Sequence, residues 1–582
     1  MKAAGVLVIT LAMLIALAPL EAAAQAPAPK VTITGLIDNV VNFNSNQGLN
    51  AADRLGGGLA QRGDKETYAR TRGRFDIIGE VGKAKGVLGL EVDMIYGQTG
   101  AQDTCGGVPA GTATATGCRP DGTSGGFDAD NDVRIPFELR WMYVEFPFSG
   151  SGSLLPFVPF AGTARVGGQP YTTTISGKPS IFADSDFGGI NVDLAISPTF
   201  KLQGTYAQFE EASVGSQGNL AATGFGRGDD WGAIVAFEIN PTKELRVKPI
   251  AAWQEFAGTT SANLRRGTGG YAVGAPNFLP NSTVAGAVNC AGAAIVVPCR
   301  ATEERRGTVG VDATWRSGPA YINPTAFFQF GQRERIPSAT DPGVSGSAGA
   351  QRIEVADISA WIVDVQGGYR LGPLFLEARA MYTSGNDSED NLNKSINYYQ
   401  PFQTGNSYWF GWGEANTIGS IDYLTSLYGF SNSLSHTGNI GYDRYGRAEF
   451  ALRARYSLTP ALSVYGIVSP AWAAKKVDTD QVITANGLAV PTGAATTVPG
   501  SRADKGDDRY LGTGLTAGFT WQFAPGLTFD AVYGVFLPGA ASDVTVNRCT
   551  FAGGAACGAS TDFVRKDAED THVASARVRF TF

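Results

Sequence analysis

Arginines recur at positions of the same parity in several segments, often two residues apart, and this spacing carries the clearest chemical signal in the chain. Side chains of a β-strand leave the backbone on alternate faces, so residues two apart share a face. Each series therefore places guanidinium groups in a row on one side of a strand. Such a row can attract anions, and it can also pair with carboxylates on neighbouring strands. The series are Arg70, Arg72 and Arg74, then Arg447, Arg453 and Arg455, and finally Arg577 and Arg579.

Residues 571–582, which read THVASARVRFTF, show what lies on the opposite face of such a strand. Val578 and Phe580 alternate there with Arg577 and Arg579, so one face suits lipid and the other suits water. An arginine that faces lipid at mid-bilayer costs roughly 2–4 kcal/mol, and the charged face must therefore point into the lumen of a transmembrane barrel. One strand of a soluble sandwich could show the same alternation. The pattern is decisive because it recurs in residues 70–81, 88–96 and 447–456.

The charged residues on these inward faces form the predicted pore lining. Acids accompany the arginines, and this leaves two interpretations open. In one, cross-strand ion pairs stiffen the wall. In the other, an arginine-rich constriction attracts anions while the acids shape the field, and both can hold at once. The predicted lining residues are Arg70, Arg72, Arg74, Glu91, Asp93, Arg140, Arg165, Arg379, Arg447, Arg453, Arg455, Arg577 and Arg579.

The amino-terminal residues predict export. Residues 1–24 combine Lys2, an apolar run and the small residues Ala22 to Ala24, which is typical of a cleaved secretory signal peptide. Residues 25–582 show no composition shift and are predicted to form a single outer-membrane β-barrel domain. Charged residues make up 17% and the mean hydropathy is −0.05, as expected for a wall that half faces lipid and half faces water. The modest net charge of −7 argues against a nucleic-acid partner.

The chain offers little material for catalysis or for a cofactor. It contains two histidines, no nucleophile-elbow motif and no phosphate loop, so we expect neither an enzyme nor a bound cofactor. The acidic run at Asp128, Asp130 and Asp132 is a weak calcium candidate, because no glycine and distant glutamate complete an EF-hand pattern. A solvated acidic loop tip is the preferred interpretation of this run.

Alternating segments bounded by turn residues predict an all-β, antiparallel, up-and-down transmembrane barrel of about eighteen strands, with sixteen to twenty compatible with the pattern. Short turns alternate with long connections near 45–66, 99–133, 168–187, 212–229, 258–304, 332–353, 385–445, 475–506 and 539–567. The short turns are expected on the periplasmic side and the long loops outside the cell. The six cysteines fall in three of the long loops and are predicted to form local disulfides. The pairs are Cys105 with Cys118, Cys290 with Cys299, and Cys549 with Cys557.

Two loops have features beyond their length. The third long connection, residues 168–187, is short enough to fold inward as a constriction loop, by analogy with general porins. The seventh, residues 385–445, contains many aromatic residues, among them Tyr398, Tyr399 and Phe402. A disordered loop would avoid so many aromatic residues. Either the seventh loop packs on itself or caps the mouth, or it forms an aromatic platform for a solute.

The last strand, which ends on Phe582, resembles the carboxy-terminal strand of outer-membrane β-barrels, and the whole pattern resembles the porin superfamily of Gram-negative bacteria. This resemblance implies a chain embedded in outer-membrane lipid and lipopolysaccharide, with Phe582 read by the barrel-assembly machinery and with a homo-trimer as one assembly. Residues 527–539 (LTFDAVYGVFLPG), with the preceding strand and turn, resemble the alginate-export family. That family implies eighteen strands and an arginine-lined pore for an anionic polysaccharide.

These observations favour a passive outer-membrane channel for small hydrophilic solutes, with anions as the candidate class because of the arginine-rich lumen. The first alternative is an exporter or specific channel for an acidic saccharide. The second alternative is a surface or scaffold barrel that its loops close.

Overall fold

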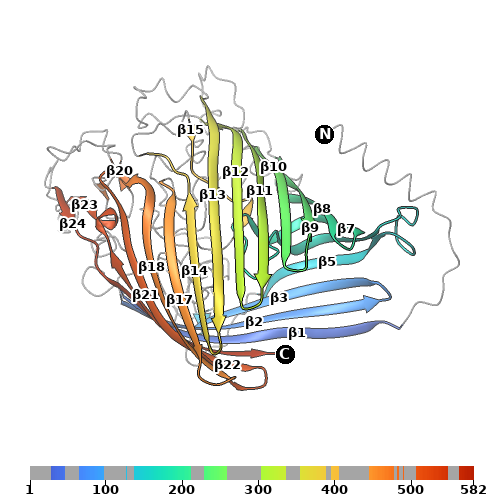
Figure 1. Cartoon of the computed structure of the whole chain (residues 1–582), viewed down its shortest axis with the longest axis horizontal. Coiled ribbons are helices and arrows are strands. Elements are labelled where there is room, and N and C mark those ends of the chain that lie inside the picture. The colour runs from blue at the N-terminus through green and yellow to red at the C-terminus, as the bar shows by residue number, and fades with distance from the viewer. Residues whose placement is uncertain are drawn as a thin grey trace, which may run out of the picture.

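Long antiparallel strands form one continuous sheet in the computed structural model (Figure 1). The structure describes residues 28–45, 65–96, 126–127, 137–211, 229–257, 303–335, 354–387, 395–404, 445–477, 482–483, 489–490, 506–547 and 563–582. Within these ranges, 18 strands make up the barrel. They are β1 (Lys30–Ser45), β2 (Lys65–Val81), β3 (Ala84–Tyr96), β5 (Phe137–Ser149), β6 (Ala161–Thr172), β7 (Ala183–Ser197), β8 (Phe200–Glu211), β9 (Asp229–Ile239), β10 (Leu245–Ala257), β11 (Glu303–Ser317), β12 (Ala320–Arg335), β13 (Glu354–Leu371), β14 (Leu374–Thr383), β17 (Arg447–Ser457), β18 (Leu462–Val477), β21 (Asp508–Ala524), β22 (Leu527–Pro538) and β25 (Thr571–Thr581).

The sheet closes on itself because the first strand pairs with the last. β1 pairs with β2 along one edge and with β25 along the other, in register from Leu36 opposite Thr581 to Ser45 opposite His572. The terminal residue extends this seam, since Gly35 and Phe582 exchange two backbone hydrogen bonds of 3.0 and 3.1 Å. No barrel strand is left with an open edge, which is what a membrane-spanning sheet requires. The predicted closed antiparallel barrel of eighteen strands is confirmed.

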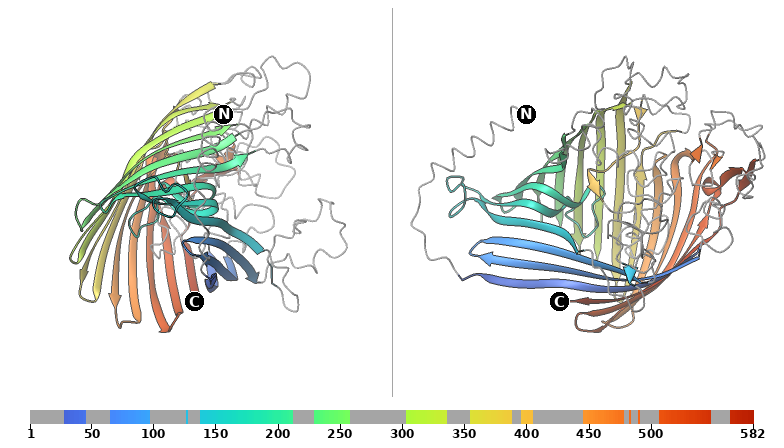
Figure 2. Two further views of the ribbon diagram at one scale, coloured as in Figure 1. Left: turned by 90° about the vertical axis from the view of Figure 1, so that its right-hand side faces the viewer. Right: turned by 180° about the vertical axis from the view of Figure 1, so that it is seen from behind.

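Strand direction changes around the barrel. Figure 1 shows β10–β13 running steeply, whereas β1–β3 run across the view, and the side view in Figure 2 shows the strands spreading as a fan. Tight turns join many of the neighbours. Gly372 at φ 56° and Gly526 at φ 71° occupy the left-handed region in two of these turns, which glycine adopts without a Cβ clash.

Short elements lie beside the barrel strands. β4 (Gly126–Phe127), β15 (Ser395–Ile396) and β16 (Gln403–Thr404) pair in parallel with β3, β13 and β7. A separate four-stranded sheet contains β19 (Val482–Ile483), β20 (Ala489–Val490), β23 (Val544–Asn547) and β24 (Phe563–Lys566), and η4 (Ala540–Ser542) is a single 3-10 turn. Among the described residues, no helix is long and apolar enough to cross a membrane.

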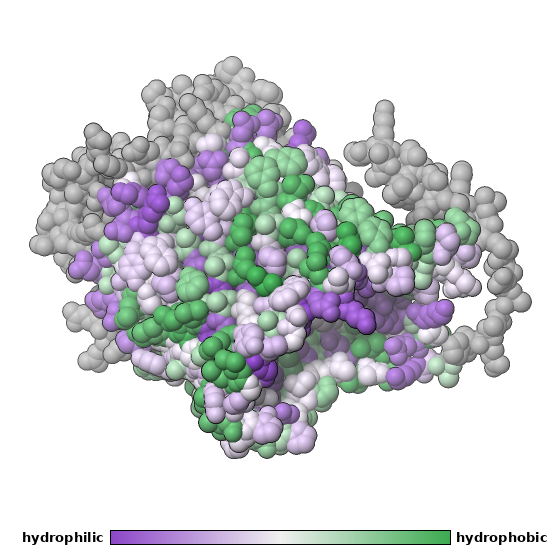
Figure 3. Space-filling view, in the orientation of Figure 1, coloured by the Kyte–Doolittle hydropathy of each residue, from purple (hydrophilic) through white to green (hydrophobic). Residues whose placement is uncertain are grey.

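The two faces of the barrel differ in polarity, as the sequence predicts. On β25, Val578 and Phe580 are exposed, whereas Arg577 is buried on the opposite face. Phe582 is also exposed and contacts Phe580 and Phe75, with ring centroids 5.5 and 6.1 Å apart. Figure 3 shows hydrophobic side chains over much of the surface and hydrophilic ones gathered in a hollow between β1–β3 and β8–β12. The outer face is therefore suited to lipid and the inner face to water.

One predicted boundary was wrong. The third long connection was placed at residues 168–187, but β6 continues to Thr172 and β7 begins at Ala183. Pairs such as Gln169 with Phe187 extend the ladder beyond the residues that carry a clear polarity pattern. The loop itself is therefore residues 173–182.

Candidate functional site

Glu91 on β3 is the centre of one charge cluster on the inner wall. Its carboxylate lies 2.9 Å from Nε of Arg72, 2.7 Å from Nε of Arg74 and 3.0 Å from Nε of Arg140. The register of β2 against β3 and the adjacent strand β5 brings these three guanidinium groups together. Asp76 and Asp186 also lie close enough to act electrostatically on Arg140, so three arginines and three carboxylates share this part of the wall. The side chain of Asp93, which was predicted to line the same wall, lies outside the described residues.

A second set of ion pairs follows the seam between β22, β25 and β1. Arg577 donates to Asp530 from Nε (3.1 Å) and Nη2 (2.9 Å). Arg579 donates to Asp38 from Nε (2.5 Å) and Nη2 (2.7 Å). The second interaction joins the last strand to the first, so it stabilises the closure itself. Arg579 binds both carboxylate oxygens of Asp38, whereas both bonds of Arg577 go to Oδ2 of Asp530. A bidentate guanidinium–carboxylate pair such as Arg579 with Asp38 is among the stronger polar contacts.

Other predicted lining residues are also placed among polar partners on the buried face. Arg379 makes two 2.9 Å hydrogen bonds to Asp364, and Arg453 donates to Glu377 at 2.6 Å. The remaining pairs are Arg165 with Glu145 and Arg447 with Glu449, and Arg70 is buried on the same wall. Arg455 is half-buried and has no ion pair with any described residue. Cross-strand ion pairs therefore account for most of the predicted arginines.

The loop of residues 173–182 folds into the barrel and reaches the inner face of β10–β13. The backbone N–H of Ile175 donates to Asp312 on β11 (2.8 Å), and its carbonyl accepts from Arg246 on β10 (3.3 Å). Phe182 stacks on Phe327 of β12 with ring centroids 4.7 Å apart. The predicted inward fold of this loop is confirmed.

Lys178 anchors the tip of this loop. Its ammonium lies 2.9 Å from the Asp364 carboxylate and donates to Thr325 Oγ1 (2.8 Å) and to the carbonyls of Asn323 and Asp364 (3.3 and 3.2 Å). Burial lowers the pKa of Lys178, and the negative charge of Asp364 opposes that effect. The sequence predicted the inward loop but not this lysine, because only the fold brings residue 178 beside residue 364.

Residues 395–402 also fold inward, and they pack on the inward loop of residues 173–182. Tyr399 donates its hydroxyl to the carbonyl of Ile181 (3.1 Å), and the N–H of Phe402 donates to Phe182 (2.8 Å). Both aromatic rings belong to a buried apolar cluster inside the barrel. The cluster also contains Tyr171, Ile181, Phe182, Ala183, Phe187, Ala207, Ile234, Ala236, Ile250, Phe327, Ala360, Ile362 and Met381.

Buried polar contacts fix the same segment to β11 and β12. Arg306 donates to Gln329 (2.8 Å), to Gln400 (2.9 Å) and to Glu304 (2.8 Å), and Arg333 donates to the hydroxyl of Tyr398 (3.3 Å). The sequence did not predict these contacts: the interpretations of the seventh loop, residues 385–445, were a loop that packs on itself or caps the mouth, or an aromatic platform for a solute. The predicted pore lining did not include Arg306 or Arg333. Part of the loop packs inside the barrel rather than only on itself or over the mouth. The rest of that loop lies outside the described residues.

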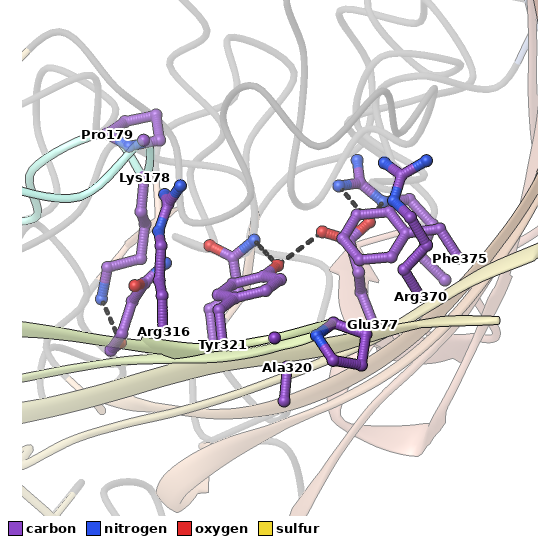
Figure 4. A pocket seen from close by; sticks show the side chains of 14 residues that line it. Lys178, Pro179, Arg316, Ala320, Tyr321, Arg370, Phe375 and Glu377 are labelled. Atoms are coloured by element: carbon purple, nitrogen blue, oxygen red, sulfur yellow. Dashed lines mark hydrogen bonds and ion pairs between the residues drawn. The ribbon is translucent and has the colours of Figure 1, made fainter. Parts of the chain in front are cut away.

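A cavity of about 410 Å³ lies between the tip of the inward loop of residues 173–182 and the wall. Figure 4 shows Tyr321 between Arg316 on one side and Arg370 with Phe375 on the other. The Tyr321 hydroxyl donates to Glu377 (2.6 Å) and accepts from Gln366 (2.9 Å). The lining consists of Gly177, Lys178, Pro179, Arg316, Gly318, Pro319, Ala320, Tyr321, Asn323, Gln366, Arg370, Phe375, Glu377 and Arg453. It contains four cationic side chains and one carboxylate.

Several predictions concern residues outside the described part of the chain. They are the signal peptide, the three cysteine pairs (Cys105, Cys118, Cys290, Cys299, Cys549 and Cys557) and the calcium candidate (Asp128, Asp130 and Asp132). These remain predictions.

No family model and no curated protein sequence matches the chain. The solved structures to which it is similar include three Pseudomonas aeruginosa proteins. OccK7 (OpdD) is 10% identical over 95% of this chain and 99% of that one, with a TM-score of 0.42. OccK2 (OpdF) is 8% identical over 95% and 98%, with a TM-score of 0.42, and OccK11 (OpdR) is 8% identical over 95% and 96%, with a TM-score of 0.40.

The fold assignment rests on the strand pairing of the chain itself. Eighteen antiparallel strands close into a ring, with apolar residues outside and charged residues inside. The chain therefore has the fold of an outer-membrane β-barrel of the porin type.

Proposed function

We propose that the protein is an outer-membrane channel through which small hydrophilic solutes diffuse passively, with anions preferred. The supporting observation is the polarity of the wall, which is apolar on its exposed face and densely charged on its inner face. A barrel of eighteen strands is wide enough to hold water as well as its own side chains. Water beside a charged wall provides a route for polar solutes.

Local charge supports the preference for anions. Arg455 has no ion pair with a described residue, and the cavity lining contains one carboxylate among four cations. The net charge of −7 includes every loop residue. Exposed loop charges are screened beyond about 8 Å at physiological salt, whereas low-dielectric walls focus the field of lumenal charges.

The inward-folded segments favour a small solute over a polymer. Residues 173–182 and 395–402 occupy the interior beside β7–β14 and bury an apolar cluster there. A chain of linked sugars needs a continuous wide path, and these segments narrow the path. Export of an acidic saccharide is therefore the second proposal. A surface barrel that these inward segments close is the third proposal, and the experiment below distinguishes it from a channel.

The surroundings of the protein follow from the same proposal. The apolar face would contact outer-membrane lipid and lipopolysaccharide, and the exposed Phe582 would be read by the barrel-assembly machinery. A homo-trimer is the assembly that the porin resemblance suggests. Export by a cleaved signal peptide belongs to the same proposal.

Reversal potentials of the purified protein in planar bilayers under a salt gradient test the function. We expect conductance with anion preference. Arg455→Gln should lower the ratio of anion to cation permeability, because that charge is not neutralised by a described partner. Arg453→Gln is the matched variant and should also affect stability, because it removes the partner of Glu377. A cation preference unchanged in both variants would contradict the arginine argument, and absence of conductance would favour the closed barrel.

A further inference from the structure

Asn39 on β1 is a polar residue on the outer, lipid-facing side of the barrel. Its side chain is exposed and shares a face with the exposed Val41 and Phe43, because residues two apart on a strand point the same way. Asn39 lies four residues from Gly35, which bonds the terminal Phe582, and four residues from Phe43. Eight residues of a strand extend about 26 Å before any tilt, so Asn39 is near the middle of an apolar band about 25 Å tall.

The amide of Asn39 has a partner for its oxygen but not for its nitrogen. Thr71 on β2 lies opposite Asn39 and donates to its Oδ1 at 2.6 Å, and the Thr71 hydroxyl also contacts the hydroxyl of Tyr96 on β3. Nδ2 of Asn39 has no hydrogen-bond partner among the described residues. Outward residues of other strands are apolar at this depth, for example Val235 on β9 and Leu452 on β17. An amide N–H in hydrocarbon has no water to bond, so Asn39 is better placed against a protein acceptor than against an acyl chain.

A groove of about 620 Å³ lies on the same outer face, one step along β1 from Asn39. Larger side chains on β1 and β22 line it together with small residues of β21, β22 and β25; they are Val41, Phe43, Tyr533, Ala517, Ala531, Ala574 and Ala576. Small residues let another backbone approach closely, and small residues with hydrogen-bonding side chains promote association of transmembrane helices. We call Asn39, Thr71 and this groove the seam face, because they flank the pairing of β25 with β1 (Figure 1).

We propose that the seam face is where copies of this chain contact one another in the membrane, with the Asn39 amide bonded to the same amide of a second copy. A carboxamide carries an acceptor oxygen and two donor hydrogens, so it is complementary to itself. Two amides can exchange bonds around a two-fold axis, and three can form a ring around a three-fold axis; both arrangements close. The inference names the contact face of the assembly in the proposed function and rests on that assembly, but it does not require conduction.

Asn39→Leu tests the contact, because leucine has a similar size but no donor, and Thr71 keeps its contact with Tyr96. Light scattering during chromatography of the full-length barrel in mild detergent would give the mass over a dilution series. We expect the wild type to be an oligomer and the variant to have a dissociation constant at least about tenfold higher, equivalent to about 1.4 kcal/mol. Val235→Leu, on the exposed outer face of β9, is the matched control and should leave the constant within about twofold. Heat-modified migration in gels shows that each variant is folded.

Cysteine cross-linking in intact outer membranes measures the same contact without detergent. Asn39→Cys should give disulfide-linked pairs of chains on oxidation, above the wild-type background, whereas Val235→Cys should not. A monomeric wild type would overturn both the seam face and the assembly. An oligomer that neither variant of Asn39 affects or traps would overturn the seam face and retain the assembly.

Two other occupants of the seam face have results of their own. A chain of different mass that co-purifies with the wild type but not with Asn39→Leu would assign the face to another protein and overturn the second copy. A higher thermal midpoint of Asn39→Leu at unchanged mass would show that Asn39 contacts lipid, and this would also overturn the proposal. Conductance is recorded separately, so failure of the channel and failure of the contact are distinguishable.

Discussion

Replacement of Lys178 by methionine tests whether this side chain holds the inward loop. Methionine keeps the length of the side chain but loses the ammonium, which contacts Thr325 at 2.8 Å and Asp364 at 2.9 Å. Asp364 keeps its two hydrogen bonds from Arg379, so the variant leaves no unpaired carboxylate. A hydrogen bond to a charged group contributes about 1.5–3 kcal/mol. We therefore expect docking of the loop to weaken by about 3 kcal/mol, a factor of about 100 in its equilibrium constant.

Hydrogen exchange of peptides from residues 173–182 in the detergent-purified barrel measures this change. The N–H of Ile175, which donates to Asp312, reports loop docking directly. Exchange from the opened loop should become about 100-fold faster, because local opening sets the protection. Lys201→Met is the matched control, since that lysine is half-exposed and lies 4.0 Å from Glu238. A change below about threefold in the Lys178 variant would show that apolar packing alone, such as Phe182 on Phe327, holds the loop.

Three further predictions concern the wall and its termini. Glu91→Gln should destabilise the barrel by about 3–5 kcal/mol, because three guanidinium groups lose a buried carboxylate; thermal unfolding in detergent checks this, and an unchanged midpoint would show that the cluster is solvated. Deletion of Phe582 should lower the amount of heat-modifiable barrel in the outer membrane, since the deletion removes both backbone bonds to Gly35; normal insertion would show that the terminus is dispensable. The six cysteines should react with thiol reagents on intact cells only after reduction, whereas labelling that requires a breached outer membrane would reverse the predicted orientation.

The barrel could be predicted because the bilayer imposes its constraint on every strand separately. Arg577 and Val578 are neighbours in the chain, so their side chains lie on opposite faces of the strand. Because one face contacts lipid and the other contacts water, the arginine must face the lumen and the valine must face the lipid, and no tertiary contact is needed to predict this. The same constraint repeated along the chain gives the strand number. The inward face of Arg379 or Arg453 follows in the same way. The position of Phe582 at the seam agrees with the resemblance of the last strand to outer-membrane barrels.

Contacts inside the barrel could not be predicted, because they join residues that are distant in sequence. Ile234 and Ile250 lie on the inner face, where the parity rule expects polar residues, and they are buried there by segments from other loops. A signal existed in β13, where Ile358 and Ile362 face inward while Trp361 and Val363 are exposed outside. Apolar residues on both faces of one strand indicate that something covers the inner face. Which loop covers it depends on the fold.

The interior is thus divided into two parts, and this division links the ion pairs to the proposed function. Beside β7–β14, the described loop segments cover the wall and bury apolar side chains. Beside β1–β5, ion pairs centred on Glu91 line the inner face, and beside β17–β25 the pair of Arg577 with Asp530 lies on a wall that also carries a second buried apolar cluster. Ion pairs that stiffen the wall are compatible with positive charge in the lumen, because Arg455 on β17 has no ion pair with a described residue. A hydrophilic solute would pass along the charged wall, away from the segments that cover β7–β14.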